Sequence, residues 1–290
     1  MGDTRDEAGT ARPERTLKLT LAYDGTPFVG WQRQAEGLSI QGLVEEALSR
    51  IEGAPVTVVG AGRTDAGVHA CGQAASVRLT SAIEVAALRR ALNAMLPPEI
   101  RVTGVQQVDP SFHARYSAES KTYRYTIVNG PILTPFEWRY AWHVPERLEV
   151  ARMSAAAPLF EGEHDFAAFR GTGSGVKTTV RRVQCSRLSP VAPGKEWAPW
   201  SCAIDDRSAT RLVYEVTADG FLRHMVRAIV GTLVEIGAGR RELACIERAL
   251  GSGRRADAGP TAPACGLCLV GVEYTGVGVS RGSAGLQARE

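Results

Sequence analysis

An arginine, an aspartate and a histidine lie close together in residues 60–69, which read GAGRTDAGVH. The stretch follows an apolar run at residues 56–59, and its glycines allow another backbone or a ligand to approach closely. Such a turn presents side chains instead of building core, and those on offer are Arg63, Thr64, Asp65 and His69. An aspartate is ionised at neutral pH, and a nearby arginine favours that charged form. A tight turn with a surface Arg–Asp pair is the simpler alternative.

A second stretch combines cations with aromatic rings. Residues 111–128 read SFHARYSAESKTYRYTIV, so that arginines and a lysine alternate with tyrosines, Tyr123 among them. This pattern suits RNA, because cations bind phosphates and a ring can stack on an unpaired base. The alternative is an amphipathic strand with half-buried tyrosines.

A third stretch, residues 221–236, reads FLRHMVRAIVGTLVEI and predicts the clearest helix of the chain. Arg223 and Arg227 are four residues apart, which places two like charges on one helical face, where they repel each other. Both also fall in the N-terminal half, where the helix dipole disfavours cations. An anionic partner, either a phosphate or the carboxylate of Asp65, would offset this local cost. Two solvated arginines are the alternative.

Net charge, apolar runs and cysteine spacing limit the classes of protein to which the chain can belong. The chain has 290 residues and a net charge of +3, so a basic face for nucleic acid would have to be local. No run approaches the roughly 20 apolar residues of a membrane span, and the charged first sixteen residues do not form a signal peptide. We therefore expect a cytoplasmic protein. Of the six cysteines only Cys265 and Cys268 have CxxC spacing, which predicts buried reduced thiols and no zinc site.

Periodicity predicts the elements that position these residues. In the first part, an alternating strand, an amphipathic helix, two strands, a second helix and a closing strand follow one another, at residues 17–23, 39–51, 56–59, 73–79, 83–95 and 102–108. The order β-α-β-β-α-β is that of a ferredoxin-like unit. The second part predicts helices at 147–159, 221–236 and 240–250, and strands at 178–188, 211–217 and 266–274.

These elements suggest two related halves that share one sheet. We expect a disordered tail at residues 1–15, an N-terminal α/β half at 16–110 that carries the glycine-rich turn, a C-terminal α/β half at 111–275, and a flexible tail at 276–290. A region rich in proline and tryptophan at 190–210 predicts an inserted hairpin.

Five stretches together resemble the motifs of the TruA-type tRNA pseudouridine synthases, in the order of that family: YDGTPFVGWQ, GAGRTDAGVH, FHARYSAESKTYRY, GFLRHMVRAIVG and GLCLVGVEY. The resemblance covers residues 17–274. It implies the pseudouridine synthase fold, an α+β fold in which two ferredoxin-like halves share a largely antiparallel central sheet. It also implies a homodimeric isomerase that converts uridine to pseudouridine in the anticodon stem-loop of tRNA, at positions 38, 39 and 40, without cofactor or metal.

The same resemblance implies roles for individual residues. The nucleophile would be Asp65, the tyrosine that contacts the base Tyr123, and the arginine that pairs with the nucleophile Arg227. Beside these, we expect Arg63 to fill the space left by a flipped base or to hold a phosphate, and Leu267 to form an apolar wall. Whether Asp65 attacks C1′, attacks C6 or removes a sugar proton stays open.

Two other functions would explain some of these features. A non-catalytic RNA-binding protein with two ferredoxin-like halves would explain the basic strand and the helix arginines, but not a glycine-cradled Asp65, since a carboxylate repels phosphate. An aspartyl phosphotransferase of the DxDxT type is less compatible, because the turn reads RTDAG and has no metal-binding carboxylate beside Asp65.

Overall fold

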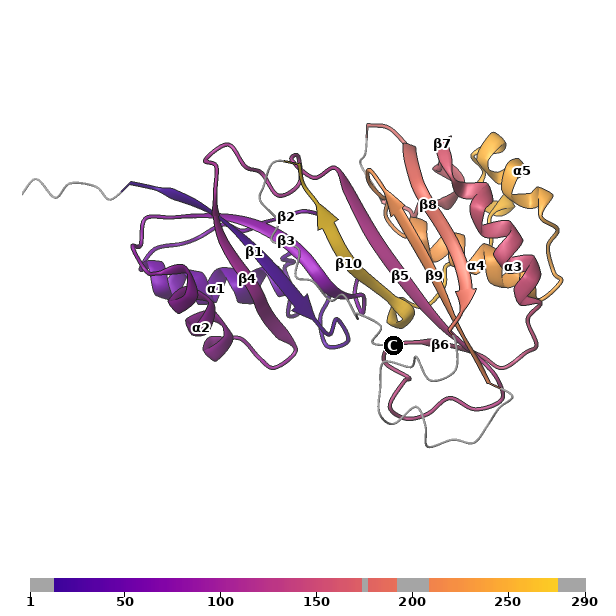
Figure 1. The fold of residues 1–290 in the computed structure, drawn as a ribbon, viewed down its shortest axis with the longest axis horizontal. Coiled ribbons are helices and arrows are strands. Elements are labelled where there is room, and N and C mark those ends of the chain that lie inside the picture. The colour runs from indigo at the N-terminus through magenta and orange to yellow at the C-terminus, as the bar shows by residue number, and fades with distance from the viewer. Residues whose placement is uncertain (1–12, 174–176, 192–208, 276–290) are drawn as a thin grey trace, which may run out of the picture.

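The computed structural model describes residues 13–173, 177–191 and 209–275. The tails expected at 1–15 and 276–290 therefore lie outside the described residues, apart from residues 13–15. Most of the insertion expected at 190–210 lies outside them as well. Within the described ranges, ten strands form one sheet, as Figure 1 shows.

The N-terminal half follows the predicted β-α-β-β-α-β order. Its elements are β1 (Arg15–Tyr23), α1 (Ile40–Glu52), β2 (Val59–Gly60), β3 (His69–Leu79), α2 (Val85–Met95) and β4 (Ile100–Val108). The alternation predicted for β1 is confirmed, since Leu17, Leu19 and Leu21 are fully buried. Two boundaries differ from the prediction by more than two residues: β2 begins at Val59 and has only two residues, and β3 begins at His69. The turn that carries Asp65 is consequently short and joins two paired strands directly.

The C-terminal half contains more strands than the sequence predicts. Its elements are β5 (Ser120–Asn129), β6 (Trp142–Val144), α3 (Val150–Ala156), β7 (Gly162–Asp165), β8 (Val180–Pro190), β9 (Thr210–Ala218), α4 (Met225–Gly237), α5 (Ala244–Ser252) and β10 (Leu267–Glu273). The short polar strand β7 has no hydrophobic alternation to reveal it. The boundary proposed between residues 110 and 111 lies between β4 and β5.

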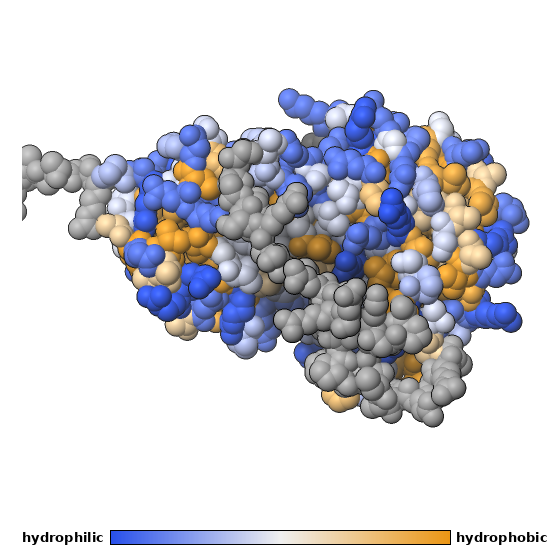
Figure 2. Space-filling model, viewed as in Figure 1, coloured by the Kyte–Doolittle hydropathy of each residue, from blue (hydrophilic) through white to orange (hydrophobic). Residues whose placement is uncertain are grey.

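The last strand joins the two halves. The sheet order is β4-β1-β3-β10-β5-β9-β8-β7, and β10 pairs parallel with β3 and antiparallel with β5 (Figure 1). The other pairings are antiparallel, except that of β5 with β6. The predicted α+β class with a largely antiparallel central sheet is thus confirmed. Figure 2 shows hydrophilic residues over most of both halves on one face, with smaller hydrophobic groups between them.

Helix α4 begins later than predicted. Its N-cap is His224, whose backbone has a φ of 62°, in the left-handed region that cannot continue a right-handed helix. Arg223 therefore precedes the helix and does not share a helical face with Arg227, so that part of the prediction was wrong. Instead, Nη1 of Arg223 donates a hydrogen bond to the carbonyl of Thr172 at 3.0 Å.

The prediction that the cysteines are buried was also wrong in part. Cys245 is buried, but Cys71 is exposed and Cys268 is only partly buried. In β10 the neighbours Leu267 and Leu269 take the buried face, and alternation turns the Cys268 side chain to the other face. Its sulfur lies 3.5 Å from that of Cys71. Cys202 lies outside the described residues.

Candidate active site

The first motif of the sequence forms the support of the turn that carries Asp65. The hydroxyl of Tyr23 lies 2.9 Å from Oγ1 of Thr64, and the backbone N–H of Trp31 donates to the Thr64 carbonyl at 3.0 Å. Thr64 is consequently buried, although the sequence suggested that it was presented to a ligand. Within the turn, the N–H of Val68 donates to the carbonyl of Asp65 at 3.1 Å. These bonds hold the aspartate on a fixed backbone.

Two glycines of the first motif allow this close contact. A Cβ atom on Gly25 would lie 2.0 Å from the carbonyl oxygen of Val68, and one on Gly30 would lie 2.6 Å from that of Thr64. Gly30 also has a φ of +110°, which side-chain-bearing residues rarely adopt. The two motifs, far apart in sequence, therefore need glycine where their backbones meet.

His69 anchors the turn and is not presented to a ligand. It is buried, and its Nδ1 lies 3.2 Å from Oδ1 of Asp24 and 3.0 Å from the N–H of Gly25. Its Nε2 lies 2.9 Å from the carbonyl of Arg139. Burial lowers the pKa of His69, against the opposing charge of Asp24. The neutral ring accepts from Gly25 and donates to Arg139, which ties three segments together. The sequence did not suggest this link.

Asp65 faces two nitrogen groups from the other half of the molecule. Nη1 of Arg227 and Nε2 of His224 each lie 3.5 Å from Oδ2 of Asp65. The side chains of Asp65 and His224 are 28% and 27% exposed, so both stay accessible, whereas Arg227 is more enclosed, at 16%. Sequence reasoning anticipated Arg227 at this place and missed His224.

The surroundings of Arg227 fix its guanidinium. Nε of Arg227 donates to the Ala262 carbonyl at 2.7 Å, and the Ala262 N–H donates to the Arg227 carbonyl at 3.0 Å. The segment passes so close to α4 that a Cβ atom on Gly231 would lie 1.8 Å from the carbonyl oxygen of Pro260. Arg227 is therefore oriented before any ligand binds.

Tyr123 lies in β5 and is almost fully buried. Its ring packs edge-on against Phe221, with centroids 5.0 Å apart. Burial raises the pKa of Tyr123 far above its usual range, and the nearby charge of Asp65 adds to the effect. The side chain is thus a neutral phenol near Asp65.

Leu267 and Arg63 lie in different surroundings. Leu267 is buried at the start of β10, opposite Tyr125, whereas Leu269 is the residue opposite Tyr123. Arg63 is exposed and makes no hydrogen bond or ion pair with any residue that the structure describes. It is the predicted site residue with the most freedom to reach a ligand.

Cations gather on one side of the turn. A Cβ atom on Gly62 would lie 3.7 Å from Cε of Lys121. Burial lowers the pKa of Lys121, and the positive charges of Arg115 and Arg181 lower it further, against the attraction of Asp219. Each of the two arginines is therefore near enough to Lys121 to repel its ammonium group.

Not all of the basic residues noted in the sequence join this group. Arg124 points to the opposite face from Tyr123 and pairs with Glu215 at 2.8 Å, and Arg182 pairs with Glu163 at 3.4 Å.

In residues 13–173, 177–191 and 209–275, no group of three or more histidine, cysteine or acidic side chains is placed to hold a metal ion. No helix there is long and apolar enough to cross a membrane.

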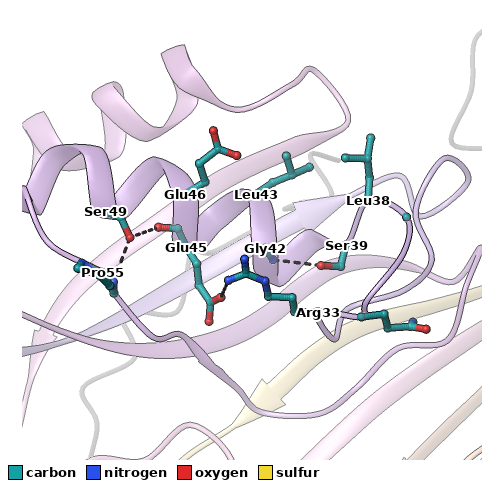
Figure 3. Close-up of a pocket in the computed structure, with 12 residues that line it drawn as sticks. Arg33, Leu38, Ser39, Gly42, Leu43, Glu45, Glu46, Ser49 and Pro55 are labelled. Carbon is teal, nitrogen blue, oxygen red and sulfur yellow. Dashed lines mark hydrogen bonds and ion pairs between the residues drawn. The ribbon is translucent and has the colours of Figure 1, made fainter.

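Figure 3 shows a groove along α1, lined among others by Arg33, Ser39 and Glu45. Arg33 and Glu45 form an ion pair of 3.6 Å across it. The groove is not lined by Asp65, Tyr123 or Arg227, so it is not the place where these residues meet.

Comparison with known proteins gives a consistent result. A family model described as tRNA pseudouridine synthase matches residues 20–117 and 156–275. The chain is 44% identical over 259 residues to a tRNA pseudouridine synthase A of Syntrophotalea carbinolica, covering 89% of this chain and 96% of the relative. It is 45% identical over 260 residues to the protein of the same name in Moorella thermoacetica, covering 89% and 99%. A Solibacter usitatus relative is 44% identical over 263 residues, covering 90% and 100%.

Proposed function

Because the chain belongs to the tRNA pseudouridine synthase family, we propose that it acts on the anticodon stem-loop of tRNA, with Asp65 as the nucleophile. Membership makes the protein an isomerase of tRNA uridine, and this sets aside both a purely RNA-binding protein and a phosphotransferase. The proposed targets are the uridines at positions 38, 39 and 40. The observation that carries the role of Asp65 is its placement 3.5 Å from Arg227 on a turn that is otherwise rigidly bonded.

The chemistry requires an ionised, accessible carboxylate. The C1′–N1 bond must break, the uracil must rotate, and C5 must bond to C1′, which calls for a group that holds sugar or base in the meantime. The Arg227 guanidinium places a positive charge 3.5 Å from Oδ2 of Asp65. The target base has to leave the stack first. Tyr123 would then contact the flipped uracil, and Leu267 would contribute an apolar wall behind it.

The cations beside the turn support recognition of folded RNA. Arg115 and Arg181 each repel Lys121 in the free protein, and phosphates would relieve that repulsion. Arg63, exposed and unpaired among the described residues, is placed to hold a phosphate or fill the space of the flipped base. Such contacts read shape and phosphate position more than base identity. A folded stem-loop should therefore be modified faster than a linear RNA of the same sequence.

The decisive experiment compares Asp65→Asn with the wild type on unmodified tRNA, without added metal or nucleotide, and maps pseudouridine. Glu46→Gln is the matched control, since it neutralises an exposed carboxylate on α1. We expect no turnover for Asp65→Asn, with tRNA affinity nearly unchanged, and full activity for the control. Activity of Asp65→Asn within about tenfold of wild type would refute the nucleophile, because tenfold is only ~1.4 kcal/mol of barrier.

The assembly and the location are proposed on the family resemblance. We expect a homodimer, with one tRNA contacting both subunits, and a cytoplasmic location, where tRNA is found. Sedimentation at working concentration tests the first point, and a fully active monomer would contradict it.

A further inference from the structure

Isomerisation of uridine requires a proton acceptor that has not been assigned so far. C5 of uridine carries a hydrogen, whereas C5 of pseudouridine is bonded to C1′ and has lost it. This holds whichever atom Asp65 attacks, so a base must take the C5 proton in every version of the reaction. The inference below rests on the proposed function.

Most groups near Asp65 are unsuited to this task. Tyr123 is a neutral phenol, because burial raises its pKa far above the usual range. Arg227 is a permanent cation and has no acceptor. His69 is buried, with its ring nitrogens engaged by Gly25 and Arg139. Within the described residues, the imidazole of His224 remains as a second proton-accepting group beside the Asp65 carboxylate.

The backbone holds His224 in a strained conformation. Its φ of 62° is the only positive value among the described residues other than glycine. Conformations of this kind cost free energy and persist where the surroundings enforce them. Here the N–H of Gly171 donates to the Arg223 carbonyl at 2.8 Å, and a Cβ atom on Gly171 would lie 2.6 Å from Nδ1 of His224. The imidazole therefore lies against the Gly171 backbone, with its Nε2 3.5 Å from Oδ2 of Asp65.

The charges that surround His224 favour its neutral form. Burial lowers the pKa of His224 below its ordinary 6.5, and the cations Arg227, Arg223 and Arg255 lower it further. Among the described residues, the carboxylate of Asp65 opposes these effects. A neutral imidazole can accept a proton at physiological pH, as general-base catalysis requires.

We propose that Nε2 of His224 accepts the C5 proton of the isomerised base. The C1′–N1 electron pair leaves with the uracil. The π pair of the C5–C6 double bond forms the new bond to C1′, while the electron pair on N1 forms a temporary N1–C6 double bond, whose π pair returns to N1 when C5 loses its proton. The C5–H electron pair then restores the C5–C6 double bond while the proton passes to Nε2. N1 takes a proton from water, and the imidazolium returns its proton to solvent, so that atoms and charge balance.

The test is the variant His224→Asn, assayed in single turnover on tRNA that carries either uridine or 5-deuterouridine. Asparagine tolerates the left-handed conformation, so the backbone is preserved. General-base catalysis contributes typically 10²–10⁴-fold, and we expect a rate loss in that range. We also expect a deuterium isotope effect larger than that of the wild type, because removal of the C5 proton becomes rate-limiting.

The pH dependence of the isomerisation rate gives a second test of His224. The rate of the wild type should fall as pH drops through the imidazole pKa, and this acidic limb should be absent in His224→Asn. A slow variant with an unchanged isotope effect would show a purely positional role and overturn the proposal, and so would a rate within about tenfold of the wild type. Absence of pseudouridine with the wild-type protein would instead contradict the proposed function, and unfolding curves of the variant verify its fold.

Discussion

Nη1 of Arg227 lies 3.5 Å from Oδ2 of Asp65, although the two residues come from different halves of the sheet. The guanidinium is oriented by the Ala262 carbonyl, 2.7 Å from its Nε, and so it approaches the carboxylate in one geometry. The ion pair is therefore both an electrostatic and a positional link between the halves.

Two replacements of Arg227 separate the effect of its charge from the effect of its fixed position. Arg227→Ala removes the charge and leaves the Ala262 carbonyl without its donor, so we expect an activity loss of about 10²–10³-fold and a stability loss of about 1–3 kcal/mol. Arg227→Lys keeps the charge but not the bond from Nε, and should retain intermediate activity. Single-turnover rates and urea unfolding measure both effects. Normal activity of Arg227→Ala with a weaker salt dependence of tRNA binding would make Arg227 a phosphate contact instead.

The hydroxyl of Tyr23 is predicted to position the turn that carries Asp65. Tyr23→Phe removes the bond to Thr64, and Tyr274→Phe removes a bond of 2.7 Å to the Ala114 carbonyl elsewhere. Each change should lower the free energy of unfolding by about 1 kcal/mol. Only Tyr23→Phe should also lower the isomerisation rate. Equal rates for the two variants would mean that the Thr64 bond does not position Asp65.

Gly25 tests the close packing of the first two motifs. Gly25→Ala places a methyl group 2.0 Å from the Val68 carbonyl and should cost about 1–3 kcal/mol of stability, with a loss of activity. Gly251→Ala is the control, because a Cβ atom there meets nothing within 4 Å and Gly251 lies inside α5. That change should stabilise the protein by about 0.5–1 kcal/mol. Thermal unfolding measures the stability of both variants. A Gly25→Ala protein as stable as the wild type would contradict the close packing of Gly25 against Val68.

Stability should depend on pH through His69. Burial lowers the pKa of His69 in the folded state below 6.5. At pH values between that folded-state pKa and 6.5, the unfolded chain therefore binds more protons than the folded protein. The contribution of His69 to the free energy of unfolding is fully present above pH 6.5, and it is lost as pH falls through the folded-state pKa. Urea unfolding between pH 5 and 8 measures this slope, which should be smaller in His69→Asn. His224→Asn, which removes another lowered pKa, separates the two contributions. An unchanged slope in His69→Asn would rule out its part.

Cys71 and Cys268 are predicted to form a disulfide under peroxide. Their sulfurs are 3.5 Å apart, and the hydrogen bond from Cys268, aided by the charge of Arg124, lowers the pKa of Cys71 to about 6. Peroxide should oxidise the Cys71 thiolate to a sulfenic acid, which Cys268 then attacks with release of water. Mass spectrometry of the digested protein should find the linked peptides, and Cys71→Ser should abolish them. Cys245→Ser, at a buried thiol, is the control.

Patterns in the sequence predicted the elements with regular periodicity and failed where a single residue decides. Alternation located β1, and helical spacing located α1 and α2. The start of α4 was misplaced because Phe221 and Leu222 fit the helical pattern, while the left-handed backbone of His224 leaves no trace in hydrophobicity. Asp65, Tyr123 and Arg227 could be nominated from motifs. The Asp24–His69 contact could not, since it depends on how two distant turns meet.

The position of β10 has a consequence for synthesis of the chain. Of the strands that the structure describes, it is the last to leave the ribosome, yet it lies in the middle of the sheet and pairs with both β3 and β5. A nascent chain, or one truncated before Leu267, leaves both of those strands with an unpaired edge. Open edges of this kind invite pairing with other chains. Premature termination near the C-terminus should therefore yield an aggregating polypeptide, and not a smaller active enzyme.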